Sequence, residues 1–408
     1  MVSLWFGGRP AAQTSERDFS SFEFSDYETG TDEIEGQPTI ALQTIALQRT
    51  AGDLARHGGF GRNSNMGPPM AKMAYPEFHK ALLDQNLYPS SSRRIKFEET
   101  RYSYLFKSGT QFYKIRKNSP IYSSLAVKEV FALEALRLSQ RWAPENDQAV
   151  VPICKTGDSY VFSGDGEVIE YALRMTQLAG NHWASDLHRA GKLTPNTLGR
   201  LARYLATQHE TYAAGDKTQD AGRPEHLREL FEEVSYQVKK YVGQTVSQPM
   251  FDMIIRPVEK FIDDSRKLFL RRQRRDRIVD GHGAFLPEHI FIVSKEVLAV
   301  SPLDGQQKYR ILDAANDLAV FINEMELMGA AENAELFLKR YISATHDREL
   351  PKILPIYRTF QAMRSGLAFS EWSVTSSESN KKITEFLAKA HECFNLAVKC
   401  ARDIPRSV

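Results

Sequence analysis

Downstream of an aperiodic N-terminal stretch, hydrophobic residues first follow the two-residue period of β-strands. Tyr104 and Phe106 alternate with polar residues and a Ser-Gly pair follows, so residues 95–116 are expected to form a β-hairpin. Residues 126–142 carry apolar side chains at helical spacing. Further elements are expected as a helix at 77–86 and strands at 150–153, 160–162 and 168–175. The pattern predicts a small sheet-based lobe over residues 73–177.

In the remainder of the chain the apolar residues recur mainly at helical spacing. Thr194 and Pro195 provide an N-cap and a first-turn proline, so a helix should begin there. Other helices are expected at 225–242, 251–269, 313–328, 334–345, 351–369 and 379–402. Pro257 is expected to kink the second of these. The predicted fold class is therefore α+β, with a larger and mainly helical lobe over residues 178–408.

Residues 1–72 show no sustained period and are rich in glycine, serine, threonine and acidic residues. Residues 16–35 are strongly acidic, with phenylalanine and tyrosine interspersed. Such a composition buries too little apolar surface to fold, so a disordered acidic tail is expected. One interpretation is an arm that docks onto a protein partner. The favoured interpretation is an unstructured leader that precedes a true start at Met70 or Met73.

Composition and charge argue against several classes of function. The formal net charge of +2 gives no basis for bulk binding to nucleic acid. The apolar runs are too short to cross a bilayer, so no membrane span is expected. The three cysteines form no metal-binding or disulfide framework, which favours a reducing, cytoplasmic setting.

The candidate chemistry gathers in residues 280–304. A Gly-His-Gly loop follows the arginine-rich end of a long helix, and two apolar runs, 290–293 and 297–300, then predict a β-ribbon. Because the second strand runs back along the first, it delivers Ser301 to the end of the ribbon at which the loop lies. The arginine-rich helix end, residues 271–277, is expected to be solvated.

Several short segments carry a resemblance to a known family. They are Tyr75–Asp84, Tyr88-Pro89, Glu98–Thr100, Tyr113–Lys117, Ala143-Pro144, Val151–Ile153, Glu170–Met175, Asp280–Gly283, Pro287–Ile290 and Asp313–Ala319. In their shared order they resemble an uncharacterised bacterial branch of the aminoglycoside phosphotransferase-like proteins. Some members of that branch are fused to a P-loop ATP-binding domain, but no Gly-x-x-x-x-Gly-Lys-Ser/Thr loop occurs here. The resemblance implies a two-lobed, protein-kinase-like fold.

The resemblance also implies roles for the loop residues. His282 and Gly283 match the family's His-Gly-Asp motif, but Ala284 stands where the catalytic aspartate is expected. Ser301 stands where the family places its metal-binding aspartate. Alanine cannot accept a proton, and a neutral hydroxyl is a poorer Mg²⁺ ligand than a carboxylate. The resemblance therefore predicts a degenerate catalytic site.

A nucleotide-binding set is implied on the smaller lobe. Lys114 matches the lysine that contacts the phosphates. Glu134 is the candidate helical partner of this lysine, although the family glutamate aligns nearer Ala135, which is rotated by about 100° on the helix. Phe112 stands where a small residue usually roofs the adenine, so its ring should narrow the pocket. These differences weaken the case for ATP and Mg²⁺ as cofactors, and no cofactor is expected to be required.

Two residues are candidate metal ligands by family position. His289 occupies a position that takes asparagine or histidine, and Asp304 lies just past the metal position and is the best surviving candidate. Asp280 and Glu288 lie nearby and could serve as displaced carboxylates.

Three other polar residues are expected to be structural. His209 ends an apolar helix and should pack there or brace a loop, and Asp313 and Asp317 should cap the helix that follows them. In the family, the segment that contains these two aspartates braces the catalytic loop.

The combined pattern favours a catalytically inactive, pseudokinase-like protein that acts as a binding or scaffold module for an unidentified protein partner. A second hypothesis is an active ATP-dependent phosphotransferase that acts on a small hydroxylated molecule through displaced carboxylates. A third is a structural subunit of a larger assembly.

Overall fold

The computed structural model describes residues 77–406, except 89–93, 101–102, 119–121, 123, 215–219, 294–295 and 376–378. The predicted tail of residues 1–72 and the lobe boundary expected at residue 73 lie outside the described residues. Among the helices of the described part, none is both long and apolar enough to cross a membrane.

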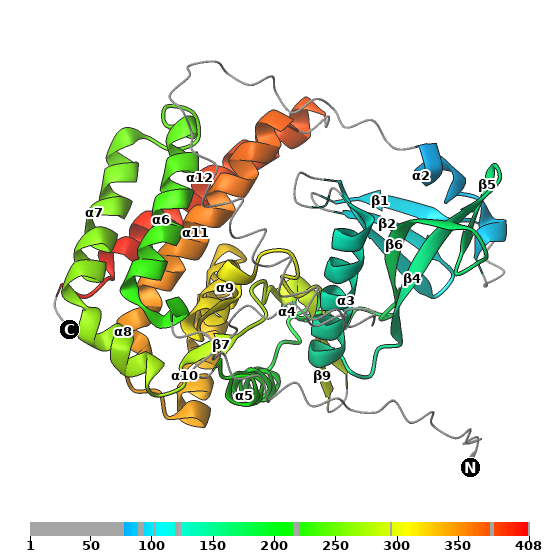
Figure 1. Ribbon diagram of the computed structural model, residues 1–408. Helices are drawn as coiled ribbons and strands as arrows, with labels where there is room; N and C mark the ends of the chain where they lie inside the picture. The colour runs from blue at the N-terminus through cyan, green and yellow to red at the C-terminus, as the bar shows by residue number, and fades with distance from the viewer. Residues whose placement is uncertain are drawn as a thin grey trace, which may run out of the picture. The chain divides into compact units, whose positions relative to one another are not determined.

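The smaller lobe is built on one antiparallel sheet with strand order β1-β2-β3-β6-β4-β5 (Figure 1). Its strands are β1 Lys96–Glu99, β2 Ser103–Ser108, β3 Gln111–Arg116, β4 Gln148–Thr156, β5 Ser159–Phe162 and β6 Glu167–Thr176. Two short helices, α2 Glu77–Ala81 and η1 Gln85–Leu87, precede the sheet. Helix α3, Leu125–Trp142, separates β3 from β4 in sequence and packs against β4 and β6.

The segment expected to form one hairpin forms three strands. Strand β1 was missed because its four residues are all exposed and show no hydrophobic alternation. Thr100 connects it to β2, since the Thr100 amide donates to the Ser103 carbonyl at 2.9 Å and its hydroxyl accepts from the Ser103 amide at 3.0 Å. The turn between β2 and β3 lies at the predicted Ser-Gly pair, where Gly109 has a φ of 57°.

Alternation along β3 decides which of its side chains reach the interior of the lobe and which reach α3. Tyr113 and Ile115 are buried in the aromatic core of the sheet. Phe112, Lys114 and Arg116 alternate with them and therefore lie on the opposite face. That face carries the candidate phosphate-binding lysine.

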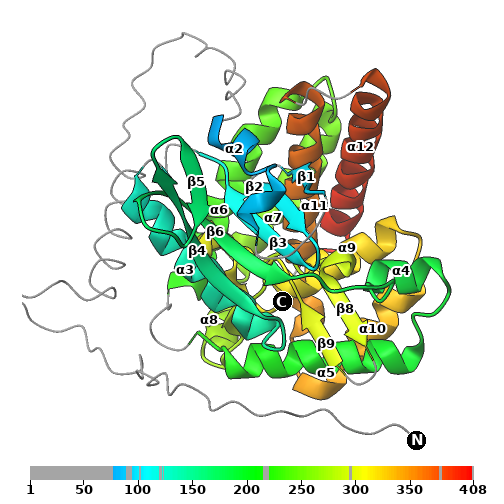
Figure 2. The same ribbon diagram turned by 90° about the vertical axis from the view of Figure 1, so that its right-hand side faces the viewer.

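The larger lobe is mainly helical and contains two small ribbons. Its helices are α4 Ala184–Arg189, α5 Pro195–Thr211, α6 Pro224–Val238, η4 Lys239–Tyr241, α7 Gln248–Asp264, α8 Arg266–Gln273, η5 Pro287–His289, η6 Gln307–Tyr309, α9 Ala315–Leu327, α10 Ala331–Thr345, α11 Leu350–Thr375 and α12 Asn380–Arg402. Its ribbons pair β7 Ile278–Asp280 with β10 Ile311–Asp313 and β8 Ile290–Val293 with β9 Glu296–Ala299. Figure 2 shows the β8–β9 ribbon near α4 and α5. The predicted two-lobed, kinase-like α+β fold is confirmed.

The helix starts and breaks follow local chemistry. Thr194 caps α5 as predicted, because its hydroxyl accepts from the Thr197 amide at 3.2 Å. The single helix expected over residues 251–269 is interrupted, but at Ser265 and not at Pro257, which lies inside α7. The turn at Ser265 redirects the chain into α8, whose apolar residues then join the core.

The arginine-rich end of α8 is not uniformly solvated, which corrects the expectation for residues 271–277. Arg272 is only 1% exposed, and its guanidinium bonds Asp313 at 2.8 Å and Asp347 at 2.9 Å. Burial opposes the charge, but the two carboxylates raise the pKa of Arg272 overall. Asp313 does not begin a helix but is the last residue of β10; its carboxylate nevertheless accepts from the Ala315 amide at the start of α9 at 2.9 Å, as expected of a capping residue.

Candidate functional site

The Gly-His-Gly loop is held by one buried carboxylate at the start of α9. Asp317 accepts hydrogen bonds from the backbone amides of His282 at 2.6 Å and Gly283 at 2.7 Å. The His209 Nε2 atom donates to the same carboxylate at 3.1 Å, and its Nδ1 lies 2.7 Å from the Tyr341 hydroxyl. Burial alone would raise the pKa of Asp317, but these donors lower it. The predicted bracing role of His209 is confirmed.

The loop is also packed tightly around its histidine. The His282 ring is fully buried, with ring centroids of Trp142 and Phe285 at 5.0 and 5.7 Å. Burial lowers the pKa of His282 to about 3, so the ring is neutral near physiological pH. A Cβ atom at Gly281 would lie 2.5 Å from a carboxylate oxygen of Asp317, so this position requires glycine.

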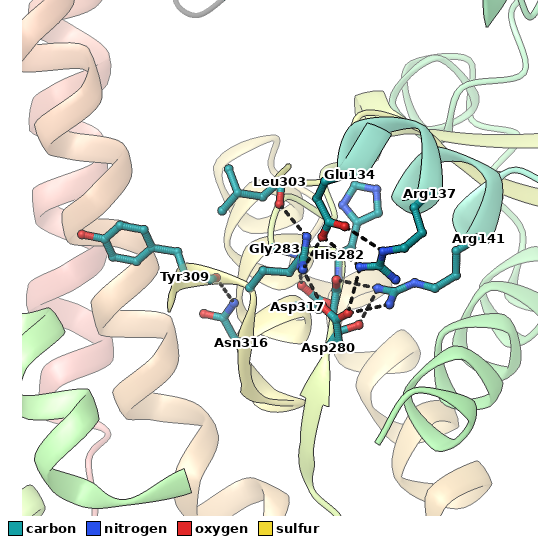
Figure 3. A network of polar contacts seen from close by, with 12 residues as sticks. Glu134, Arg137, Arg141, Asp280, His282, Gly283, Leu303, Tyr309, Asn316 and Asp317 are labelled. Atoms are coloured by element: carbon teal, nitrogen blue, oxygen red, sulfur yellow. Dashed lines mark hydrogen bonds and ion pairs between the residues drawn. The ribbon is translucent and has the colours of Figure 1, made fainter. Parts of the chain in front are cut away.

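A second cluster joins helix α3 to the same loop (Figure 3). Asp280 accepts from Arg141 of α3 at 2.9 Å and from Arg310 at 2.6 Å. Arg141 also donates to the Gly281 carbonyl at 3.1 Å. Burial would raise the pKa of Asp280, but the arginines lower it, so the carboxylate is ionised. Asp280, a candidate displaced carboxylate, is thus engaged by two buried arginines.

The candidate pairing of Glu134 with Lys114, against which the alignment of the family glutamate with Ala135 argued, is not formed. Glu134 instead accepts from Arg137 at 2.7 Å, as Figure 3 shows, and from Arg310 at 3.2 Å. A different salt bridge links helix α3 to the sheet. Here the helix supplies the cation and the strand the carboxylate: Lys128 of α3 bonds Glu170 of β6 at 2.6 Å. Burial raises the pKa of Glu170 although Lys128 opposes the shift. No local pattern in the sequence predicts this pair, because its members are 42 residues apart.

Lys114 lies beside Asp304, the carboxylate of the loop that follows β9. The Lys114 Nζ atom is 3.3 Å from one oxygen of Asp304, and Arg116 forms a short ion pair with the other. Burial would raise the pKa of Asp304, but the two cations lower it. Ser301 lines the same small pocket as Lys114 and Asp304. The structure therefore brings together three of the residues that sequence singled out.

The residues at the other family positions have different environments. The His289 Nδ1 atom donates to the carbonyl of Ala284 at 2.9 Å, and burial lowers the pKa of this histidine. Ser301 is exposed and has a φ of 58°, a left-handed conformation that is uncommon outside glycine. Glu288 is exposed. Phe112 is half-buried and lies opposite Met175 in the sheet, with the Lys107 ammonium 5.6 Å from its ring centroid.

The donors at the site do not fit a magnesium ion. Mg²⁺ prefers carboxylate and water oxygens in an octahedral arrangement. Asp304 already bonds two cations, His289 donates its Nδ1 proton to a carbonyl, and Ser301 offers only a hydroxyl. Within the part of the chain that the structure describes, no group of three or more His, Cys, Asp or Glu side chains is arranged to hold a metal.

Several residues of the site were not singled out from the sequence. They are Arg141, Arg310, Lys128 and Glu170. Each gains its role from a partner that is distant in sequence, so no local pattern points to it. Arg116 was placed on the face of β3 that carries Lys114 by the two-residue period of the sequence, and the structure shows it there, paired with Asp304.

The chain has a two-lobed, kinase-like fold: a β-rich lobe with one helix is followed by a helical lobe that carries a Gly-His-Gly loop. No protein-family model matches the chain. Uncharacterised proteins of Mycobacterium tuberculosis and Mycobacterium bovis are 22% identical over 207 residues, which cover 51% of this chain and 42% of each relative. The matched region thus spans less than half the length of these relatives.

Solved structures of small-molecule kinases are similar to the chain. A choline kinase from Cryptosporidium parvum has a TM-score of 0.48 at 13% identity, over 80% of this chain and 96% of that one. A GDP complex of aminoglycoside 2'-phosphotransferase-IIIa has a TM-score of 0.49 at 16% identity, over 78% of this chain and 98% of that one.

Proposed function

We propose that this chain is a kinase-like binding module that does not transfer phosphate and that acts through a protein partner. The observation that carries the proposal is the state of Asp304. Lys114 contacts one oxygen of this carboxylate, and Arg116 bonds the other. Both oxygens are therefore engaged by cations of the protein itself.

The chemistry of the loop supports the same proposal. Phosphoryl transfer requires an acid that orients the nucleophile and acids that hold Mg²⁺. Ala284 offers no acid at the first position, and loss of a positioned base costs roughly 10²- to 10⁴-fold in rate. Asp280, the nearest carboxylate in sequence before the loop, is bound by Arg141 and Arg310. For Asp280 to act as the base in place of the missing aspartate, its buried ion pairs with these two arginines would have to break.

A second candidate is an active phosphotransferase that acts on a small hydroxylated molecule. The observation in its favour is the 3.3 Å distance between Lys114 and Asp304. If a nucleotide drew Lys114 and Arg116 onto its phosphates, Asp304 would be released and could ligate Mg²⁺. This candidate makes Asp304 essential for turnover.

Turnover measurements distinguish the two candidates. Purified chain is incubated with Mg²⁺ and ATP and a panel of small alcohols and amino sugars, and ADP release is followed. Lys114→Met and Asp304→Asn are compared with the control Lys117→Met, which alters the next lysine of the segment, one that pairs with Glu99. We expect wild type and all variants to match the background. Turnover that Lys117→Met retains and both other variants lose would overturn the proposal in favour of the second candidate.

A further inference from the structure

A cationic surface lies at the end of helix α8 and takes no part in the contacts that hold the Gly-His-Gly loop. Figure 1 shows α8 on the side of the larger lobe that points away from the smaller lobe. Six cations from two segments form this surface, which we call the α8 patch. They are Arg271, Arg274, Arg275 and Arg277 from the end of α8 and the turn after it, and Arg348 and Lys352 from the start of α11 and the turn before it.

The two segments of the patch are fixed side by side. Arg277 donates to the Thr345 carbonyl at 3.1 Å and lies 3.6 Å from Asp347, which is itself held in the buried triad at the end of α8. Each segment turns through one residue in the left-handed conformation, Asp276 with a φ of 54° and His346 with a φ of 53°. The cations are therefore presented by an ordered backbone, which reduces the entropy lost when a ligand binds.

The patch carries more positive charge than its neighbours neutralise. Its six cations exceed Asp276, Glu349 and the net negative charge of the buried triad by three. Arg274, Arg348 and Lys352 are exposed and form no ion pair with any described residue. Three cations on one surface are thus available to an anion from outside the chain.

One carboxylate of the molecule shows what the patch can recognise. Glu349 accepts from Arg271 at 2.9 Å and from Arg275 at 3.2 Å, so two arginines one turn apart hold a single carboxylate. The Arg275 side chain is nevertheless 61% exposed. Guanidinium groups match the planar geometry of carboxylates. Arg274 and Arg348 offer the same donors beside this pair.

We propose that the α8 patch binds an acidic segment of a protein partner, whose carboxylates pair with Arg274, Arg348 and Lys352. The inference rests on the proposed function and deepens it, because it states the chemistry of the partner. Opposite charges at exposed sites mainly speed association and select partners, and each contact adds little affinity. We therefore expect reversible binding that weakens as salt is added.

The patch suits an acidic polypeptide better than other polyanions. Nucleic acid presents an unbroken row of phosphates, part of which Asp276 and Glu349 would repel. A polypeptide can place neutral residues opposite these two acids. A membrane surface is disfavoured as well, because none of the large apolar side chains exposed in the described part of the chain lies in either segment.

Fluorescence anisotropy tests the proposal on the full chain, with a labelled peptide in which glutamate alternates with serine, in about 150 mM salt. The triple variant Arg274→Ser, Arg348→Ser, Lys352→Ser removes the three available cations. It should bind the peptide about tenfold more weakly, because each exposed contact contributes roughly two- to threefold. A peptide with glutamine in place of glutamate should bind wild type about tenfold more weakly than the glutamate peptide does.

A second triple variant provides the matched control. It changes Lys155 of the smaller lobe, Lys192 before α5 and Lys381 in the first turn of α12, which are all exposed. Lys155→Ser, Lys192→Ser, Lys381→Ser lowers the net charge of the chain by the same amount and should bind the peptide as wild type does. Equal weakening in the two triple variants would assign the binding to bulk charge and overturn the proposal.

Other outcomes also decide against the proposal. They are no binding of the glutamate peptide to wild type, or tighter binding of single-stranded DNA or phosphatidylglycerol vesicles that the patch variant weakens. Another is a gain of about tenfold in peptide affinity when the acids of residues 16–35 are replaced by their amides, because the chain itself would then occupy the patch.

Single variants keep the test decisive if the triple variant does not fold. Arg274→Ser and Arg348→Ser should then each lose about two- to threefold in affinity, and the absence of both losses overturns the proposal. Because these measurements contain no nucleotide and no metal, a negative result leaves the turnover test of the proposed function unaffected.

Discussion

The buried ring of His282 links the packing of the Gly-His-Gly loop to the stability of the protein at mildly acidic pH. In the folded state, burial lowers the pKa of His282 to about 3. Unfolding exposes the ring and returns its pKa to about 6.5. As the pH falls below about 6.5, the unfolded state therefore takes up a proton that the folded state refuses. The free energy of unfolding should decrease progressively between about pH 6.5 and about pH 3.

The size of this loss follows from the two pKa values. The linkage relation gives a decrease of about 2 kcal/mol from His282 between pH 7 and pH 5, most of it below pH 6. The neighbouring charges are included in the folded pKa: Asp317 favours the protonated ring, whereas His289 and Arg141 disfavour it. Other buried histidines add to the total loss, so only the difference between wild type and a variant isolates His282.

Urea denaturation at pH 7, 6 and 5 measures this difference. His282→Phe removes the titrating ring but keeps a planar side chain beside Trp142 and Phe285. Its stability relative to wild type should improve by about 2 kcal/mol between pH 7 and pH 5, whatever the offset at pH 7. His391→Gln, which changes an exposed histidine of α12, should follow the wild-type curve. If the free energy of unfolding falls equally in wild type and His282→Phe between pH 7 and pH 5, the conclusion that the His282 ring is buried and neutral is refuted.

Two further substitutions test the contacts around the loop. Arg272→Met leaves the buried Asp313 without its cation and Asp347 with only Arg277, at 3.6 Å, and should lower the free energy of unfolding by about 3–5 kcal/mol in urea titrations. A loss below about 1 kcal/mol would contradict the buried triad. Gly281→Ala places a Cβ atom 2.5 Å from Asp317 and should cost about 1–3 kcal/mol, seen as a lower melting temperature. Its control is Gly199→Ala in α5, where the nearest atom would be 3.6 Å away and the melting temperature should not fall.

The parts of the fold that could be predicted are those in which many residues repeat one period. The long helices and the strands of the smaller lobe show such periods, and the Thr194 cap gave one helix start directly. Strands β7 and β10 could not be predicted, because three residues carry no usable period and the two strands meet only through the fold. Arg272 is a similar case: its partners lie 41 and 75 residues away, so the local run of arginines suggested solvent.

In the candidate site, too, local motifs could be read from the sequence, whereas contacts between distant residues could not. The replacement of acids by Ala284 and Ser301 is visible in the sequence, because the motif around them is local. What binds the remaining acids is not visible. Asp280 is engaged by an arginine 139 residues away, and Asp304 by a lysine 190 residues away. Sequence could therefore identify the missing groups but not how the surviving groups are used.

The three carboxylates around the loop each perform a different task that needs no ligand. Asp317 holds the loop backbone, Asp280 joins the loop to α3, and Asp304 joins the larger lobe to β3. Under the proposed function this division explains how a kinase-like cleft can keep its order without a metal ion. Phosphate transfer would require an acid at the position of Ala284 and another to hold the metal.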